Sequence, residues 1–104
     1  MPVLVTLQVG PVDWPRFRAA LEWLYRQEAP GWLSSTAYRL ERDPAYVLVI
    51  DEWESHAAFH AFADRVDPEF NQRAGTTGLP WQVEVWVPTD APRLRRGRPA
   101  TGED

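Results

Sequence analysis

The sequence contains neither cysteine nor lysine, and all eleven of its basic residues are arginine. Without cysteine, the chain has no disulfides, no thiolate nucleophile and no sulfur-ligated metal centre. Without lysine, Schiff-base chemistry through a lysine amine is excluded as well. Covalent chemistry would therefore rest on Ser, Thr, Tyr, Asp or Glu side chains.

Long apolar runs are also absent. No stretch of about 18 apolar residues, the length needed to span a membrane, and no secretory leader occurs in the chain. We therefore expect a cytoplasmic protein without a membrane partner. Residues 1–88 carry seven arginines against twelve acidic residues, so most of this surface would repel a nucleic-acid duplex. The expected partner is a small molecule.

The length and composition predict one small domain. The chain has 104 residues, of which 44% are hydrophobic, and this is enough for a single modest core. We assign residues 1–88 to the domain. Residues 89–104 are rich in Arg and Pro, and are expected to be disordered or to form an arm on a partner. The exclusive use of Arg, with abundant Ala and Pro, is compatible with a GC-rich bacterial genome.

The spacing of apolar residues predicts the order of the elements. Alternating or continuous apolar residues indicate strands at 3–9, 46–53 and 81–87, and a segment rich in β-branched, Ser and aromatic residues indicates another at 32–40. Apolar residues at helical spacing indicate one helix after Asp13 and another after Ser55, each of these residues serving as the N-cap. The first helical segment is expected to stop at Pro30, and Pro68 to begin a separate short turn or helix.

The order β-α-β-β-α-β is that of the split βαβ, or ferredoxin-like, α+β fold. In this fold, two helices cover one face of a four-stranded antiparallel sheet. The first and third predicted strands are largely apolar on both faces, so the second face also needs a cover. We expect a homodimer that stacks two sheets into a dimeric α+β barrel.

Three segments of the chain resemble the antibiotic biosynthesis monooxygenase family of dimeric α+β barrels. They are Ala-Pro-Gly-Trp at 29–32, Arg-Leu-Glu-Arg-Asp at 39–43 and Asp-Glu-Trp-Glu-Ser-His-Ala-Ala-Phe at 51–59, and the resemblance covers roughly residues 3–88. It implies a pocket between helices and sheet in which polycyclic anthrones or naphthols react with molecular oxygen without metal or flavin. Other branches of this family degrade haem.

The functional residues of the family match this chain only in part. In the quinone-forming branch, a strand-end Trp works with an Asn four residues earlier; Trp53 matches the Trp, but Val49 stands at the Asn position. Tyr38 stands where some of these enzymes have a strand His, and Phe59 where they have a helix Tyr. Phe62 replaces both a frequent helix His and the Trp of the haem-degrading branch. The resemblance therefore implies altered chemistry or relocated polar groups.

Asp51 is the predicted general base. Val49, Asp51 and Trp53 alternate onto one strand face, which the resemblance makes the pocket side. A carboxylate in an apolar cleft has a raised pKa, and can remove a proton from a phenol or an anthrone C–H. The alternative is a solvated carboxylate, or one paired with Arg. A register slip of one residue would turn Asp51 outward and Glu52 inward.

Two histidines, His56 and His60, lie four residues apart on the second predicted helix. Their spacing permits a metal pair, but the family does without metal and we expect none. His60 is a candidate proton shuttle to Asp51 or to substrate, because imidazole titrates near neutral pH. His56 is a candidate binding residue, or simply faces solvent.

The remaining candidates would bind substrate or support catalysis. Trp53 is either a catalytic or stacking residue or a core residue. Tyr38 is expected to face the pocket as a hydrogen-bond partner for a phenolate, or to serve as strand filler. Asn71 and Arg73 are expected near the pocket mouth, although a surface salt bridge explains Arg73 equally well. Of the other five Trp residues, those at 14, 32, 81 and 86 are expected to pack in the core, and the Trp at 23 to meet a partner subunit. The predicted substrate-binding set is completed by Val49, Phe59 and Phe62.

These residues favour an enzyme that acts on a polycyclic aromatic of the polyketide type. The leading hypothesis is a cofactor-free monooxygenase that uses molecular oxygen after proton abstraction. A cyclase or isomerase of the same pathway class is the second possibility, and a non-catalytic dimeric binder of a hydrophobic aromatic is the third. High Trp content favours a flat aromatic ligand in each case.

Overall fold

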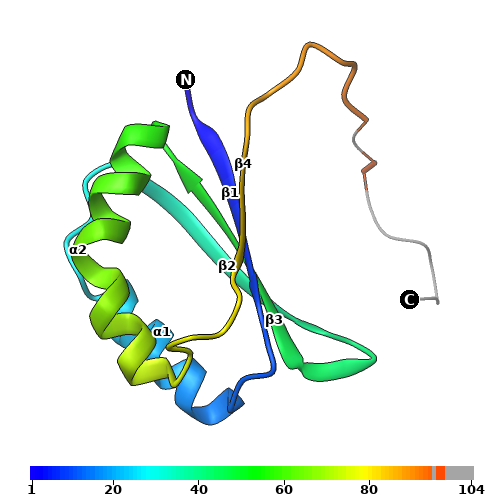
Figure 1. Ribbon diagram of the computed structural model, residues 1–104. Helices are drawn as coiled ribbons and strands as arrows, with labels where there is room; N and C mark the ends of the chain where they lie inside the picture. The colour runs from blue at the N-terminus through cyan, green and yellow to red at the C-terminus, as the bar shows by residue number, and fades with distance from the viewer. Residues whose placement is uncertain (95, 98–104) are drawn as a thin grey trace.

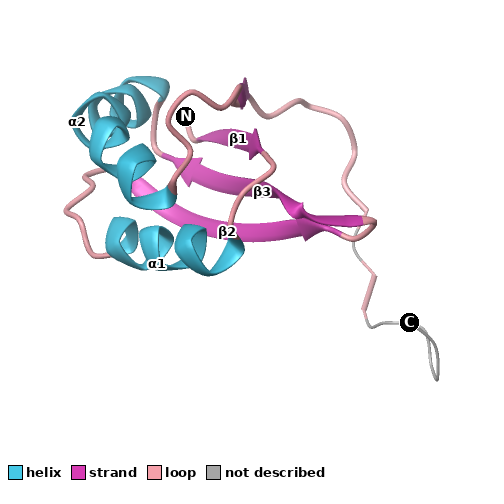
Figure 2. Cartoon of the chain, turned by 60° about the horizontal axis from the view of Figure 1, so that its bottom comes forward, coloured by secondary structure: helices cyan, strands magenta, loops and turns pink. Residues whose placement is uncertain are grey.

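The computed structural model describes residues 1–94, 96 and 97. Its elements follow the order β1 (Val3–Val9), α1 (Trp14–Tyr25), β2 (Trp32–Leu40), β3 (Asp43–Trp53), α2 (His56–Ala74) and β4 (Gln82–Trp86). The strands form one antiparallel sheet in the order β2-β3-β1-β4, and both helices lie on the same face of it (Figures 1 and 2). The predicted ferredoxin-like α+β fold is therefore confirmed.

The register of the sheet decides which side chains face the helices. Val5 on β1 lies opposite Asp51 on β3, and Asp51 in turn lies opposite Ser35 on β2. Residues paired in this way point to the same face of the sheet. Asp51 is buried and Glu52 is exposed, so the predicted register is confirmed and the slipped alternative is wrong.

Both helices begin at the predicted caps. The Asp13 side chain accepts a hydrogen bond from the Arg16 N–H, and the Ser55 side chain accepts one from the Ala58 N–H. Each bond satisfies a backbone donor that has no partner within the helix. Helix α1 ends at Tyr25, earlier than the predicted stop at Pro30.

Pro68 does not interrupt α2, so the prediction of a separate element after Asp67 is wrong. The helix runs unbroken from His56 to Ala74 with Pro68 inside it. A proline in a helix interior costs about 3 kcal/mol. Burial of Phe62, Val66 and Phe70 at four-residue spacing on one helix face offsets that cost.

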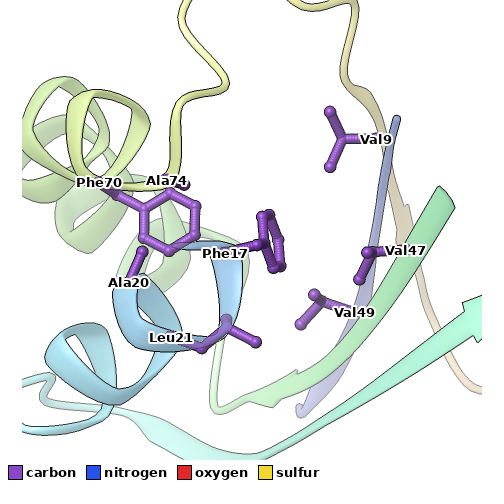
Figure 3. Close-up of a cluster of buried hydrophobic side chains, with 8 residues drawn as sticks. All are labelled: Val9, Phe17, Ala20, Leu21, Val47, Val49, Phe70 and Ala74. Carbon is purple, nitrogen blue, oxygen red and sulfur yellow. The ribbon is translucent and has the colours of Figure 1, made fainter. Parts of the chain in front are cut away.

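The core lies between the helices and the sheet. Phe17 of α1 is fully buried at its centre, with its ring 5.6 Å from that of Phe70 and edge-on to it. Figure 3 shows Val9 of β1 and Val47 and Val49 of β3 on the side of the sheet that faces this pair. A second cluster forms around Trp53, Phe59 and Phe62. Burial is therefore concentrated on the face that the helices cover.

The opposite face of the sheet and the segment after β4 lie away from the helices. Leu4, Tyr38 and Trp86 on that face are 41%, 53% and 54% exposed. The described residues after Trp86 form no helix or strand, and extend away from the body (Figure 1). Residues 95 and 98–104 of the predicted tail lie outside the described residues. Within the described part, no helix is long and apolar enough to cross a membrane.

Candidate active site

A cavity of about 220 Å³ lies between the sheet and the two helices. Its walls are mainly aromatic and aliphatic side chains from both helices and from strands β1, β3 and β4. The polar residues in the wall are Asp51, Asp67 and Asn71. Ligand pockets of about 300–1,000 Å³ are typical, so a compact ligand suits this space better than a bulky one.

Asp51 is the buried ionisable group of this cavity. Only 6% of the residue is exposed, and its Oδ1 atom has no hydrogen-bond partner among the described residues. Burial raises the pKa of the carboxyl group from 3.8 to about 6. The side-chain donors of Ser35, Trp53 and Trp32 oppose the increase, because hydrogen bonding favours the ionised form. A carboxyl group with this pKa is largely ionised at neutral pH but still basic enough to accept a proton.

Two indole rings stand beside this carboxyl group. Trp53 and Trp32 are stacked with centroids 5.4 Å apart and an interplanar angle of 1°. Both Nε1–H groups are buried without a hydrogen-bond partner among the described residues. Unsatisfied buried donors are rare. Trp53 lines the cavity, so its indole N–H can donate to an oxygen atom of a bound ligand, whereas Trp32 is not part of the cavity wall.

Phenyl rings complete the wall around Trp53. Phe59 lies edge-on to Trp53 with centroids 5.9 Å apart, and Phe62 lies at 5.4 Å. All three side chains line the cavity. They form apolar walls of the kind that bind a planar aromatic.

Asn71 holds another part of the cavity wall in place. Its Oδ1 accepts hydrogen bonds from the Thr76 hydroxyl at 2.6 Å and from the Trp81 indole at 3.1 Å. Its Nδ2 donates to the Asp67 carbonyl. Asn71 therefore lies in the wall as predicted, but its polar atoms are already engaged within the protein.

The two histidines do not reach this cavity. His56 and His60 are exposed on α2, with their rings 4.4 Å apart, and neither lines the cavity. The geometry therefore does not support His60 as a shuttle to Asp51, or His56 as a binding residue. The described residues contain no group of three or more His, Asp or Glu side chains placed to hold a metal ion.

The predicted orientation of Tyr38 is wrong. Tyr38 lies opposite Leu48, whereas Arg39 lies opposite Val47 and shares the helix-facing side. The Arg39 guanidinium lies 4.7 Å from the ring centre of Trp14. Adjacent strand residues face opposite ways, and the register places Tyr38 on the outer face.

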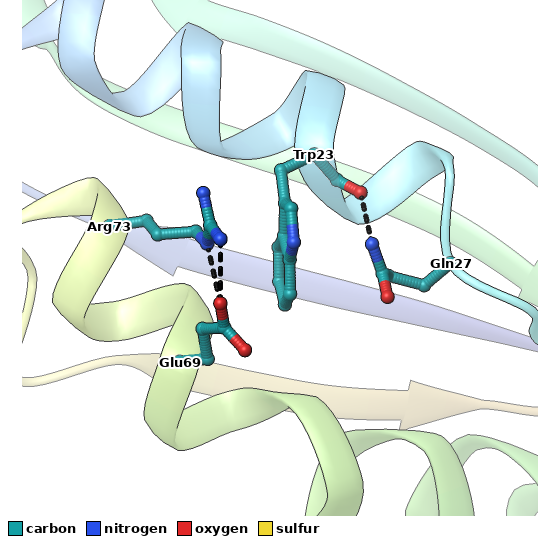
Figure 4. Close-up of polar contacts among 4 residues, drawn as sticks. All are labelled: Trp23, Gln27, Glu69 and Arg73. Atoms are coloured by element: carbon teal, nitrogen blue, oxygen red, sulfur yellow. Dashed lines mark hydrogen bonds and ion pairs between the residues drawn. The ribbon is translucent and has the colours of Figure 1, made fainter.

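Arg73 forms surface contacts rather than a part of the cavity. Its guanidinium pairs with Glu69 at 2.7 Å and lies 4.7 Å from the ring centre of Trp23, as Figure 4 shows. The alternative interpretation of Arg73 as a surface salt bridge is confirmed. Trp23 is partly buried against the core in the same contact.

Sequence reasoning missed Trp32 and Ser35. Trp32 was expected only to pack, and Ser35 carried no signal of its own. The register with Asp51 brings both close to the carboxyl group. The prediction that Tyr38 faces the pocket would have put Ser35 on the outer face, and the strand pattern alone does not reveal which residue Ser35 meets across the sheet.

The fold and cavity define a ferredoxin-like α+β protein with one buried carboxyl group in an aromatic pocket. Solved structures with this fold include a Bordetella bronchiseptica protein provisionally assigned as an antibiotic biosynthesis monooxygenase, at 16% identity and a TM-score of 0.69, covering 85% of this chain and 97% of that one. SnoaB, a cofactor-independent oxygenase from Streptomyces nogalater, is 18% identical with a TM-score of 0.61, over 86% and 94% of the two chains.

A third structure is the ActVA-Orf6 monooxygenase from Streptomyces coelicolor, in complex with nanaomycin D. It is 21% identical with a TM-score of 0.61, over 89% of this chain and 92% of that one. No family model and no curated protein matches the sequence. The predicted resemblance to antibiotic biosynthesis monooxygenases is therefore confirmed at the level of the fold.

Proposed function

We propose that the protein is a cofactor-independent enzyme that oxidises a flat polycyclic aromatic with molecular oxygen. The observation that carries the proposal is the buried Asp51 carboxyl group, whose Oδ1 has no hydrogen-bond partner among the described residues, in a cavity walled by aromatic rings. The fold shared with SnoaB, described as a cofactor-independent oxygenase, and with the ActVA-Orf6 monooxygenase supports it.

Asp51 begins the reaction by accepting a proton from an acidic C–H of an anthrone-type substrate. The resulting carbanion gives one electron to oxygen, and the two radicals combine to a peroxide anion, which takes the proton back from Asp51. Asp51 then removes the second proton from the same carbon as the O–O bond breaks. Hydroxide leaves and is protonated to water, so that anthrone and oxygen give quinone and water.

The indole N–H group of Trp53, which lines the cavity, stabilises negative charge in this scheme. The carbanion of an anthrone places its charge largely on the carbonyl oxygen, and a preorganised hydrogen-bond donor in a site that excludes water stabilises such an oxyanion strongly. The Trp53 Nε1–H is already buried without a partner among the described residues. Phe59 and Phe62 hold the rings of the substrate against Trp53.

Dissolved oxygen measured after addition of dithranol to metal-stripped protein tests the proposal. We expect Asp51→Asn to slow oxygen uptake by about 10²- to 10⁴-fold, the usual contribution of a general base. Trp53→Phe should also slow it, because the donor is lost while an aromatic ring remains. Glu52→Gln is the matched control, since the neighbouring Glu52 is exposed on the opposite face, and it should leave uptake unchanged.

The other outcomes of this assay separate the remaining functions. If oxygen uptake does not exceed the uncatalysed rate but dithranol exchanges protons in an Asp51-dependent manner, the protein is a cyclase or isomerase rather than an oxygenase. Val49, at the position where the quinone-forming branch has Asn, favours this second function. Tight binding without either reaction would leave a non-catalytic binder of aromatics.

We further propose that the chain forms a homodimer through the outer face of its sheet. That face carries Leu4, Ile50 and Trp86, which are exposed or only partly buried in the single chain. Stacking two such faces would remove this apolar surface from water. Analytical ultracentrifugation should give twice the chain mass, and Leu4→Glu should shift the species toward the monomer.

A further inference from the structure

A second, more open hollow of about 370 Å³ lies beside the candidate site. Tyr25 at the end of α1 and residues 32–35 of β2 contribute to its wall. Asp51 lines the cavity but not this hollow, whereas Ser35 lines the hollow but not the cavity. The pair of Asp51 and Ser35 therefore stands between two separate openings.

Ser35 is the direct neighbour of Asp51 across the sheet. The two residues are register partners on adjacent antiparallel strands, where Cβ atoms lie about 4.5–5.5 Å apart on the same face. A serine hydroxyl and a carboxyl group at that separation meet directly or through one water molecule. The Ser35 hydroxyl also opposes the rise in the pKa of Asp51 that burial causes.

Tyr25 extends this contact toward solvent. Its hydroxyl lies 3.1 Å from the Ser35 Oγ, and either group can be the donor. The ring lies edge-on to Trp32 with centroids 5.6 Å apart, which holds the phenol in position. Tyr25 as a whole is 46% exposed, so the chain of hydroxyl groups leads from the buried carboxyl group to the open hollow.

A bound aromatic substrate would isolate Asp51 on its cavity side. The cavity wall is mainly apolar, and a ligand that fills it displaces the water there. A protonated Asp51 would then exchange its proton with solvent only by another path.

We propose that Ser35 and Tyr25 form a proton relay that connects Asp51 to solvent in the hollow while the cavity is occupied. Ser35 Oγ accepts the Asp51 proton and passes its own proton to the Tyr25 oxygen, whose proton passes to water. The reverse sequence protonates Asp51 again, and each hydroxyl group ends as it began. This proposal rests on the proposed function, in which Asp51 is the base.

Hydrogen exchange of dithranol in D₂O without oxygen tests the relay. Asp51 removes a proton, and deuterium reaches carbon only if the carboxyl group exchanges with solvent before returning it. We expect Ser35→Ala and Tyr25→Phe to slow this exchange by about tenfold or more, less than the loss of the base itself. Oxygen uptake by the same variants should be retained, because oxidation returns each proton within the site.

Tyr25→Phe is the more diagnostic variant, because Ser35→Ala also removes a group that lowers the pKa of Asp51. Thr36→Ala and Tyr46→Phe are matched controls that remove hydroxyl groups from the opposite face of the sheet, and exchange should remain at the wild-type rate. Equal exchange in wild type and Tyr25→Phe would overturn the relay. Loss of exchange and oxidation together would also overturn it, since a disrupted site would explain both.

Infrared spectroscopy tests the relay without turnover. The C=O band of protonated Asp51, identified by its loss in Asp51→Asn, should shift after mixing into D₂O with anthraquinone bound, and should shift more slowly in Tyr25→Phe. Equal rates, or failure of anthraquinone to bind, would overturn the relay. Should dithranol oxidation and exchange prove independent of Asp51, the proposed function fails, and the infrared rates still decide whether Ser35 and Tyr25 conduct protons.

Discussion

Replacement of Asp51 by Asn should stabilise the protein at neutral pH, even though it removes the proposed base. In the folded chain, burial raises the pKa of this carboxyl group from 3.8 to about 6. The folded state therefore binds a proton more tightly than the unfolded state does. The free energy of unfolding accordingly falls as pH rises between these two values, and is constant above the folded pKa.

The size of this fall in the free energy of unfolding follows from the shift in the pKa of Asp51. At about 1.4 kcal/mol per pH unit, the change corresponds to about 3 kcal/mol. Asn has nearly the shape of the protonated side chain and carries no charge. The stability gained by Asp51→Asn should therefore be larger by about 3 kcal/mol above the folded pKa than below the unfolded value.

Urea unfolding of both proteins, at one protein concentration and across this pH range, measures the difference. Asp67 also has a pKa raised by burial and by Asp64, but it is present in both proteins and cancels. Glu52→Gln is the control, because that carboxylate is exposed. A difference between wild type and Asp51→Asn that is independent of pH, or that grows on acidification, would refute the buried, raised-pKa carboxyl group.

Three further predictions concern the site and the core. The kcat/KM for dithranol should rise with pH through about 6, where Asp51 loses its proton. Stopped-flow measurements on Asp51→Asn should show no such rise with pH. Phe17→Ala should lower the free energy of unfolding by about 3–5 kcal/mol, measured in urea, because the ring is fully buried. Gly31→Ala should lower the melting temperature more than Gly78→Ala: both positions have positive φ, but a Cβ at Gly31 would lie 2.8 Å from the Ala58 Cβ, whereas Gly78 has open space. Equal losses at the two glycines would contradict the steric explanation.

The strands and helix caps were predictable because their signals are local. Alternation along 3–9 matched β1, the β-favouring composition of 32–40 matched β2, and Asp13 and Ser55 were recognisable as caps from residue type and position. The helix through Pro68 was not predictable in this way. Its continuation depends on burial of Phe70 against Phe17, a contact between residues far apart in the chain.

The same distinction between local signals and contacts of distant segments applies to the candidate site. The sequence by itself determined that Asp51 and Trp53 share one strand face, because strand side chains alternate. Only the tertiary structure decided which residues meet Asp51, since the register of β2 against β3 selects Ser35 as its neighbour and sends Tyr38 to the other face. Register follows from the pairing of distant segments and the burial of one sheet face. The residue pattern within one strand does not reveal which residues of another strand it will pair with.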